Sequence, residues 1–246
     1  LCLEVPGNDE IAGEVAGRGG AADPQEIHRV LMAMRARLGG DLGEALTATY
    51  AAMTTEGPYS PDASHAARRA LRNRCLALLM AAGGEAGAHA AAAQFDHADN
   101  MTDRMAALAT LVHHDAPGAR ARLDAFHDAW AHDSLVMDKW FSVQASAPVE
   151  GILDRVKELT GLPAFSWKTP NRFRSVVAVF AMGNPVGFHA PDGAGYRFVA
   201  DWIVRLDPVN PQTAARVVSA FESWRRYTPA LQALMKGELE QIAATD

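Results

Sequence analysis

Three adjacent residues with metal-binding side chains, His113, His114 and Asp115, lie near the end of an amphipathic stretch that runs from Met101 to Gly118. Imidazole and carboxylate groups are common zinc ligands, so their types raise the question of a metal site. Neighbouring residues on a helix point about 100° apart, whereas zinc-binding histidines on one helix are four residues apart. The spacing favours a helix end instead, where histidines suit the negative pole of the helix dipole. Asp115 is then expected to cap the next helix.

The other histidines and the glycine-rich segment do not make a complete active site either. His127 and His132 are five residues apart, and His89 and His97 are eight apart with no carboxylate at the matching position. Segment 183–195, GNPVGFHAPDGAG, lacks the Lys-Ser/Thr of a P-loop and the strand context of a dinucleotide fingerprint, so we predict a loop. No nucleophile-elbow motif is visible. The residues alone indicate neither catalytic nor metal-binding groups.

Composition narrows the classes of protein. The chain has 246 residues, of which 49% are hydrophobic and 21% charged, as in an ordinary soluble protein. A formal net charge of -6 argues against nucleic-acid binding, and no apolar run approaches the length of about 18 residues that a membrane helix needs. Cys2 and Cys75 provide no disulfide framework, and Cys75 is expected to be a buried thiol. A cytoplasmic location without membrane or nucleic-acid partners fits these features.

Helical periodicity dominates the chain. Apolar residues recur every three or four positions in four stretches, which predicts one buried face for each helix. The four stripes are Ile27, Val30, Leu31, Met34 and Leu38; Leu42, Leu46, Tyr50 and Met53; Ala67, Leu71, Cys75, Leu78 and Ala82; and Met101, Met105, Leu108 and Val112. Segments 175–182 and 198–206 are rich in β-branched and aromatic residues, but each is isolated among helices, so we interpret both as buried helices.

Capping residues, prolines and glycines suggest where helices begin and end. A polar residue followed by proline predicts a helix start, and a glycine pair predicts a stop. The predicted starts are Asp23-Pro24, Ser60-Pro61, Asn210-Pro211 and Thr228-Pro229; the predicted stops are Gly39-Gly40 and Gly83-Gly84. Segment 13–24, GEVAGRGGAADP, is expected to be a loose loop.

These elements predict an all-α fold of roughly a dozen helices, arranged as antiparallel pairs in a superhelical array, or α-solenoid. No repeat of fixed length is visible, so regular families such as tetratricopeptide repeats are not supported. No domain boundary stands out, and residues 1–246 are expected to form a single domain.

Four segments carry a specific resemblance. They are QFDHADNMTDRMAALA (94–109), HDSLVMDKWFSVQA (132–145), PNRFRSVVAVFAMGNPVGFHAPDGAGYRF (170–198) and NPQTAARV (210–217). In this order they resemble the C-terminal helical domain of bacterial aminopeptidase N, an alanyl-type zinc aminopeptidase of the gluzincin class. The resemblance runs from near Leu3 to about Lys236.

The resemblance implies that the catalytic groups lie in a different domain from this chain. In this family the H-E-x-x-H zinc motif and the G-A-M-E-N substrate motif lie in an earlier, catalytic domain, and neither occurs here. The chain would then be the C-terminal cap, without zinc or another cofactor of its own and inactive alone. Its partners would be the catalytic domain of the same parent chain and peptide substrates. Separated from that domain, it should expose an apolar patch that allows self-association.

The family's helical domain also lends side chains to the substrate cavity, and the matching positions here are Arg174, Gln212 and Arg216. Gln212 and Arg216 are four residues apart and therefore share one helix face. Asn171 is expected to cap the helix that carries Arg174. Arginines near helix starts work against the dipole, a cost that fits a functional placement, although ordinary surface arginines would look the same in the sequence.

Two other classes of protein remain open. An independent α-solenoid that binds proteins would show an exposed apolar concave surface and no remnant of an interface with a catalytic domain. A helical metalloenzyme that uses the histidines is disfavoured by their spacing, and metal analysis of the purified chain would test it.

Overall fold

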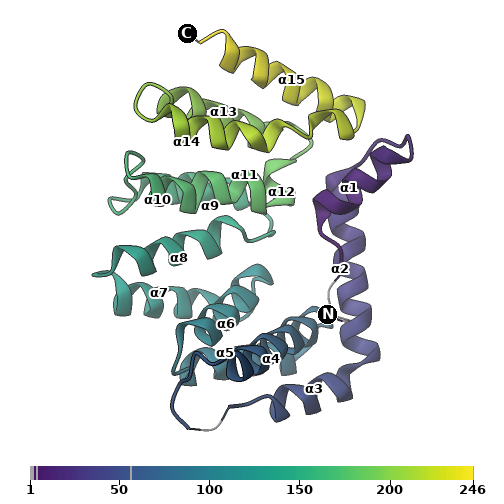
Figure 1. The fold of residues 1–246 in the computed structure, drawn as a ribbon, viewed down its shortest axis with the longest axis vertical. Helices are drawn as coiled ribbons and strands as arrows, with labels where there is room; N and C mark the ends of the chain where they lie inside the picture. The colour runs from purple at the N-terminus through teal and green to yellow at the C-terminus, as the bar shows by residue number, and fades with distance from the viewer. Residues whose placement is uncertain (1–2, 4, 56, 246) are drawn as a thin grey trace. The chain divides into compact units, whose positions relative to one another are not determined.

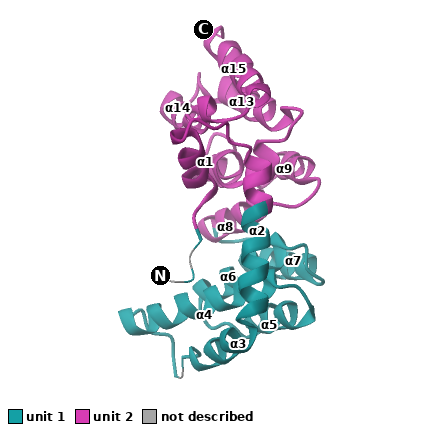
Figure 2. Cartoon of the chain, turned by 90° about the vertical axis from the view of Figure 1, so that its right-hand side faces the viewer, with its two compact units in different colours: residues 1–5, 30–133 teal, residues 6–29, 134–246 magenta. Residues whose placement is uncertain are grey.

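The computed structural model describes residues 3, 5–55 and 57–245. The described residues contain helices and no strand; one isolated parallel bridge joins Ala22 and Tyr227. The prediction of an all-α fold is confirmed, as is the helical interpretation of segments 175–182 and 198–206. The chain divides into two compact units, shown in different colours in Figure 2.

Unit 1 comprises residues 1–5 and 30–133. Its helices are the second part of α2 (Pro24–Asp41), α3 (Gly43–Ala52), α4 (Ala63–Ala81), α5 (Glu85–His97), α6 (Met101–His113) and α7 (Ala119–Trp130) (Figure 1). From α3 to α7 each helix packs on the next one along the chain, as expected of a solenoid. Cys75 is completely buried with Leu46 and Leu78, which confirms the buried thiol; Cys2 lies outside the described residues.

Unit 2 comprises residues 6–29 and 134–246. Its elements are α1 (Asn8–Gly17), the start of α2, α8 (Ser134–Ala145), α9 (Ile152–Gly161), α10 (Pro170–Phe173), the π-helical η1 (Arg174–Ala178), α11 (Val179–Gly183), α12 (Pro185–Phe188), α13 (Ala194–Leu206), α14 (Pro211–Val218), the 3-10 turns η2 (Ser219–Phe221) and η3 (Trp224–Arg226), and α15 (Pro229–Ala243). Its core is aromatic, with fully buried Phe141, Phe173, Phe180, Phe188 and Tyr196. These large rings fill the space between the helices of this unit.

Two of the predicted helix starts are confirmed by capping contacts. The carboxylate of Asp23 accepts hydrogen bonds from the backbone N–H groups of Gln25 and Glu26 at the start of α2, and Asn210 caps α14 in the same way. The start at Ser60-Pro61 is wrong, because α4 begins at Ala63 after Asp62.

Two segments that we expected to be loops contain helices. The segment 13–24 is helical as far as Gly17, where α1 ends. The segment 183–195 contains α12, whose N-cap Asn184 accepts a hydrogen bond from the backbone N–H of Gly187. In both segments the many glycines led to the prediction of a loop, although some of the residues between them are helical.

The end of the His-His-Asp stretch differs from the prediction at one residue. His113 ends α6 as expected, but Asp115 does not cap α7, whose N-cap is Gly118. Asp115 has a φ of +46°, and the N–H groups of Asp115 and Ala116 bond to carbonyls of α6, those of Val112 and Leu111. This pair of bonds is the Schellman ending of a helix, with aspartate at the position that usually holds glycine.

The apolar stripe of α2 is only partly buried. Leu31 is buried, whereas Val30 and Met34 remain 41% and 44% exposed. This helix therefore presents apolar side chains to solvent in the chain as it stands.

Gly39-Gly40 was predicted to end a helix, but α2 continues to Asp41. The reason lies in packing within unit 1. A Cβ atom added at Gly39 would lie 2.1 Å from the carbonyl oxygen of Leu78 on α4, whereas one added at Gly40 would meet nothing within 4 Å. Gly39 therefore allows two backbones to approach closely. The stop at Gly83-Gly84 is confirmed, because both glycines have positive φ and follow the end of α4.

We predict opposite effects for alanine at these two neighbouring glycines. Gly39→Ala should lower the free energy of unfolding by about 2 kcal/mol or more, since a backbone atom cannot move aside cheaply. Gly40→Ala should raise the free energy of unfolding by about 0.5–1 kcal/mol, since alanine has a higher helix propensity than glycine at an exposed position. Urea denaturation of both variants measures the difference; equal changes would contradict the close approach of α2 and α4.

Candidate functional site

The first segment that carries the family resemblance, 94–109, forms a buried polar network in unit 1. The side-chain amide of Gln94 donates to Asn73 Oδ1 at 2.7 Å and to the carbonyl oxygen of Asp103 at 2.9 Å. Asn73 donates to the Asp103 carboxylate at 2.8 Å, and the Tyr50 hydroxyl donates to Gln94 at 3.0 Å. Arg72 donates to the Tyr50 hydroxyl and lies 3.7 Å from the Asp103 carboxylate. These residues connect α3, α4, α5 and α6.

A cavity of about 520 Å³ adjoins this network, with Tyr50, Arg72, Gln94, His97 and Asp103 among its lining residues. Burial raises the pKa of the Tyr50 hydroxyl, against the opposing effect of Arg72. Because the polar groups of the network bond to one another, we interpret it as a structural connection between helices.

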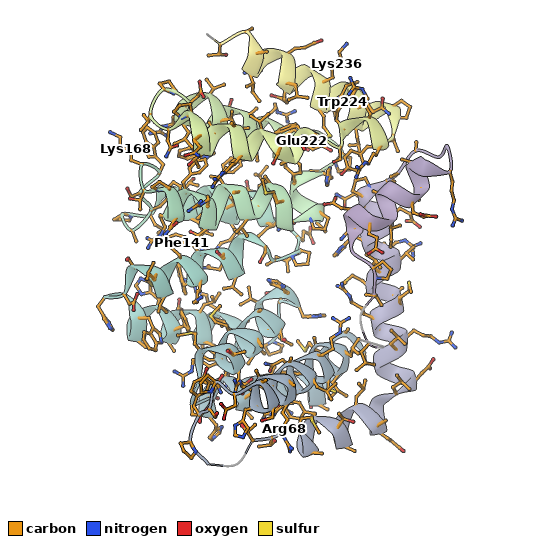
Figure 3. All side chains as sticks on the ribbon, in the orientation of Figure 1. Arg68, Phe141, Lys168, Glu222, Trp224 and Lys236 are labelled. Carbon is orange, nitrogen blue, oxygen red and sulfur yellow. The ribbon has the colours of Figure 1, made fainter. Side chains whose placement is uncertain are left out.

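The second and third resembling segments meet at Arg172 in unit 2. Its Nε donates to the Asp138 carboxylate of α8 at 2.5 Å, and its other nitrogens donate to the carbonyl oxygens of Ala164 and Ser134. The guanidinium also lies 4.6 Å from the ring centroid of Phe141, which is labelled in Figure 3. Only 8% of Arg172 is exposed, so this arginine is a structural group that ties α8 to α10.

The third segment also buries Asn184 and His189. The Asn184 amide donates to the carbonyl oxygens of Ala145 and Ala147 at 3.0 and 2.8 Å and thereby ties α12 to the end of α8. His189 Nδ1 lies 2.8 Å from the Tyr196 hydroxyl. Burial lowers the pKa of His189 to about 4, although Asp23 opposes the shift. The imidazole is therefore neutral at pH 7.

Both residues border a cavity of about 710 Å³ in unit 2. Its walls come from the start of α1, the start of α2, the α11–α12 segment and the turns η2 and η3, with Asp9, Met182 and Glu222 among the lining residues. Glu222 is labelled in Figure 3. The sequence does not indicate this cavity, because its walls come from segments far apart in the chain and because the 183–195 segment has the composition of a loop.

We predict that acid destabilises the chain through His189. Because the folded pKa of about 4 lies below the reference value of 6.5, stability from the neutral imidazole is complete above pH 6.5 and is lost as pH falls toward 4. The loss is about 3 kcal/mol, from about 1.4 kcal/mol for each pKa unit.

His189→Gln provides the comparison, since its amide can still pair with Tyr196 without titrating. Denaturation midpoints of the wild type and variant between pH 4 and 7 measure the effect. The gap between the two proteins should narrow or reverse at low pH; parallel curves would contradict the assignment.

Arg174, the first predicted site residue, begins the π-helical turn and is half-buried. Its Nη2 donates to Asn171 Oδ1 at 2.5 Å. Asn171 does not cap the helix as predicted: Thr169 is the N-cap residue and Pro170 the first helical residue, so Asn171 lies in the first turn.

Gln212 and Arg216, the other two predicted site residues, are both exposed on α14, while Thr213 and Val217 face the core. They share a face as their spacing predicts. Arg216 lies in the last turn of this short helix, so the expected conflict with the helix dipole is wrong for this residue. Within the described residues, no hydrogen bond or ion pair joins Arg174 to either of them.

Potential metal ligands do not gather in the part of the chain that the structure describes, where no group of three or more His, Cys, Asp or Glu side chains could hold an ion. Likewise, no described helix is long and apolar enough to cross a membrane.

Comparison with known protein families identifies the fold as an array of helical repeats. Residues 1–246 match the family model described as "Domain of unknown function (DUF3458_C) ARM repeats", and the chain belongs to this family. ARM repeats stack helices into a superhelical array, in agreement with the fold class predicted from the sequence.

Individual relatives indicate the kind of enzyme to which this family is related. The chain is 42% identical to aminopeptidase N of Caulobacter vibrioides over 91% of its length, and 36% identical to aminopeptidase N of Escherichia coli over 89%. A solved structure of Legionella pneumophila aminopeptidase A in complex with aspartic acid superposes with a TM-score of 0.86 at 26% identity over 98% of the chain. The resemblance to aminopeptidase N is confirmed. The chain spans 26%, 25% and 29% of these three proteins, respectively.

Proposed function

We propose that residues 1–246 are the single C-terminal domain of a cytoplasmic, zinc-dependent aminopeptidase that removes N-terminal residues from peptides. The domain encloses the active-site cavity and restricts and positions the substrate. The observation that carries the proposal is 42% identity to an aminopeptidase N over 91% of this chain, which is only 26% of that relative. The exposed apolar residues Val30 and Met34 suit a surface that docks on a catalytic domain.

The described residues do not fit a zinc site, since they contain no cluster of potential ligands. In the proposed parent enzyme, zinc in the catalytic domain would polarise the scissile carbonyl and lower the pKa of a bound water. The contribution of this chain is therefore shape and positioning: it allows only a peptide N-terminus to enter the cavity.

Three side chains would contact the substrate. Arg174 and Arg216 would donate hydrogen bonds to peptide carbonyls or to a C-terminal carboxylate, and Gln212 would border the pocket for the first residue. Their surroundings support this role. Gln212 and Arg216 are exposed, and Arg174 bonds to a neutral amide instead of a carboxylate.

We predict that the isolated chain has no aminopeptidase activity, even with added zinc, because the groups that would hold the metal are not in it. Hydrolysis of an alanyl anilide by the purified chain, with and without zinc, measures this. A metal-free sample of the parent enzyme serves as the inactive reference. Turnover by the pure domain would overturn the proposal.

We predict that Gln212→Ala and Arg216→Ala change substrate preference in the full enzyme without loss of zinc. Removing one charge-assisted hydrogen bond at Arg216 should lower kcat/KM about tenfold for peptides that reach this residue, with a smaller change for Gln212→Ala. Arg120→Ala, which removes an exposed arginine of α7 in unit 1, is the matched control. Unchanged kinetics over a panel of peptides, at equal zinc content, would remove both residues from the site.

A further inference from the structure

The sequence Asn-Arg-Phe-Arg-Ser, residues 171–175, contains two arginines whose environments differ in charge. Arg172 is buried and bonds to the carboxylate of Asp138. Arg174 is half-buried, and its Nη2 donates to the neutral amide oxygen of Asn171 at 2.5 Å. Among the described residues no carboxylate lies within ion-pair distance of Arg174, in contrast to its neighbour Arg172, which pairs with Asp138.

We propose that Asn171 is a positioning residue that orients Arg174 toward the peptide substrate while leaving its positive charge unneutralised. The proposal rests on the proposed function, in which Arg174 binds a peptide carbonyl or carboxylate. A guanidinium has five N–H donors, and the bond to Asn171 uses one of them. The other donors stay available, and the guanidinium keeps its full positive charge, for an incoming acceptor.

The backbone around Arg174 is fixed, so only the side chain needs orienting. Phe173 and Val176 are completely buried, and the Ser175 hydroxyl donates to the carbonyl oxygen of Arg172 at 2.8 Å. An arginine on a rigid segment still has several rotatable bonds, whose ordering costs entropy when a ligand binds. A hydrogen bond formed in advance by Asn171 reduces that cost.

The presence of asparagine, and not aspartate, at position 171 supports this role. Asn171 lies in the first turn of the helix, where a negatively charged side chain is stabilising and where aspartate would also form an ion pair with Arg174 three residues later. Stability alone would favour aspartate at this position. Asparagine forms a hydrogen bond of the same geometry without a negative charge. The positive charge of Arg174 is therefore not neutralised before the substrate binds.

The test uses the full enzyme that carries this domain and compares two substrates, a tripeptide with a free C-terminal carboxylate and an alanyl anilide. The measured quantity is the ratio of their KM values, tripeptide over anilide. Arg174→Ala should raise this ratio about tenfold, as expected for the loss of one charge-assisted hydrogen bond. Asn171→Asp should raise it by a similar factor, because the new carboxylate occupies Arg174. Asn171→Ala should raise it about two- to threefold.

Two controls separate positioning from general effects. Gln241→Glu adds the same single charge on exposed α15 and should leave the ratio unchanged. In an Arg174→Ala background, Asn171→Asp should have no further effect, because its action passes through the arginine. Aspartate suits the first helical turn, so the melting temperature of the variant should equal or exceed that of the wild type.

The outcomes distinguish the two proposals. A wild-type ratio for Arg174→Ala would overturn the substrate role of Arg174 and the positioning role of Asn171 with it. A raised ratio for Arg174→Ala, together with an Asn171→Asp effect that equals that of Gln241→Glu or persists without Arg174, would overturn the positioning role alone.

Discussion

A buried guanidinium must have its donors satisfied, and Arg172 shows how unit 2 meets this requirement. One side chain bonds to the carboxylate of Asp138 and to two carbonyl oxygens, and it lies against the ring of Phe141. Removing either charged partner would leave the other buried and uncompensated, which costs far more than an exposed pair contributes. The relative positions of α8 and α10, and with them the start of the helix that carries Arg174, therefore depend on this contact.

Unit 1 also joins its helices through buried polar side chains, in this case two amides and a carboxylate. Gln94, Asn73 and Asp103 bond to one another between α4, α5 and α6. Apolar packing among alanine-rich helices has little directional preference, whereas a hydrogen bond between two helices allows few registers. Several polar residues of the segments that resemble aminopeptidase N are therefore structural connections between helices.

The sequence predicted the helices and much of their burial, because the periodicity of apolar residues shows which face of each helix is buried. It was insufficient wherever the role of a residue depends on a contact or a backbone conformation that the local sequence pattern does not show. Gly39 was expected to end a helix because nothing local shows that α4 approaches it. Asp115 was assigned to the following helix, although its positive φ closes the preceding one. Asn171 was expected to be a cap, because its bond to Arg174 is visible only in three dimensions. The cavity in unit 2 combines residues from both ends of the sequence, so no local pattern could indicate it.

The π-helical turn at Arg174–Ala178 has a consequence for how this domain can change in evolution. A π-turn is commonly a single residue inserted into an α-helix. Each residue turns an α-helix by about 100°, whereas a π-turn bonds residue i to i+5 and so holds more residues in one turn. The turn therefore accommodates an extra residue while Arg172 before it and Phe180 after it both remain buried. Elsewhere in this helix an insertion or deletion would rotate the following residues away from the core, so a change in length is tolerated best within the π-turn.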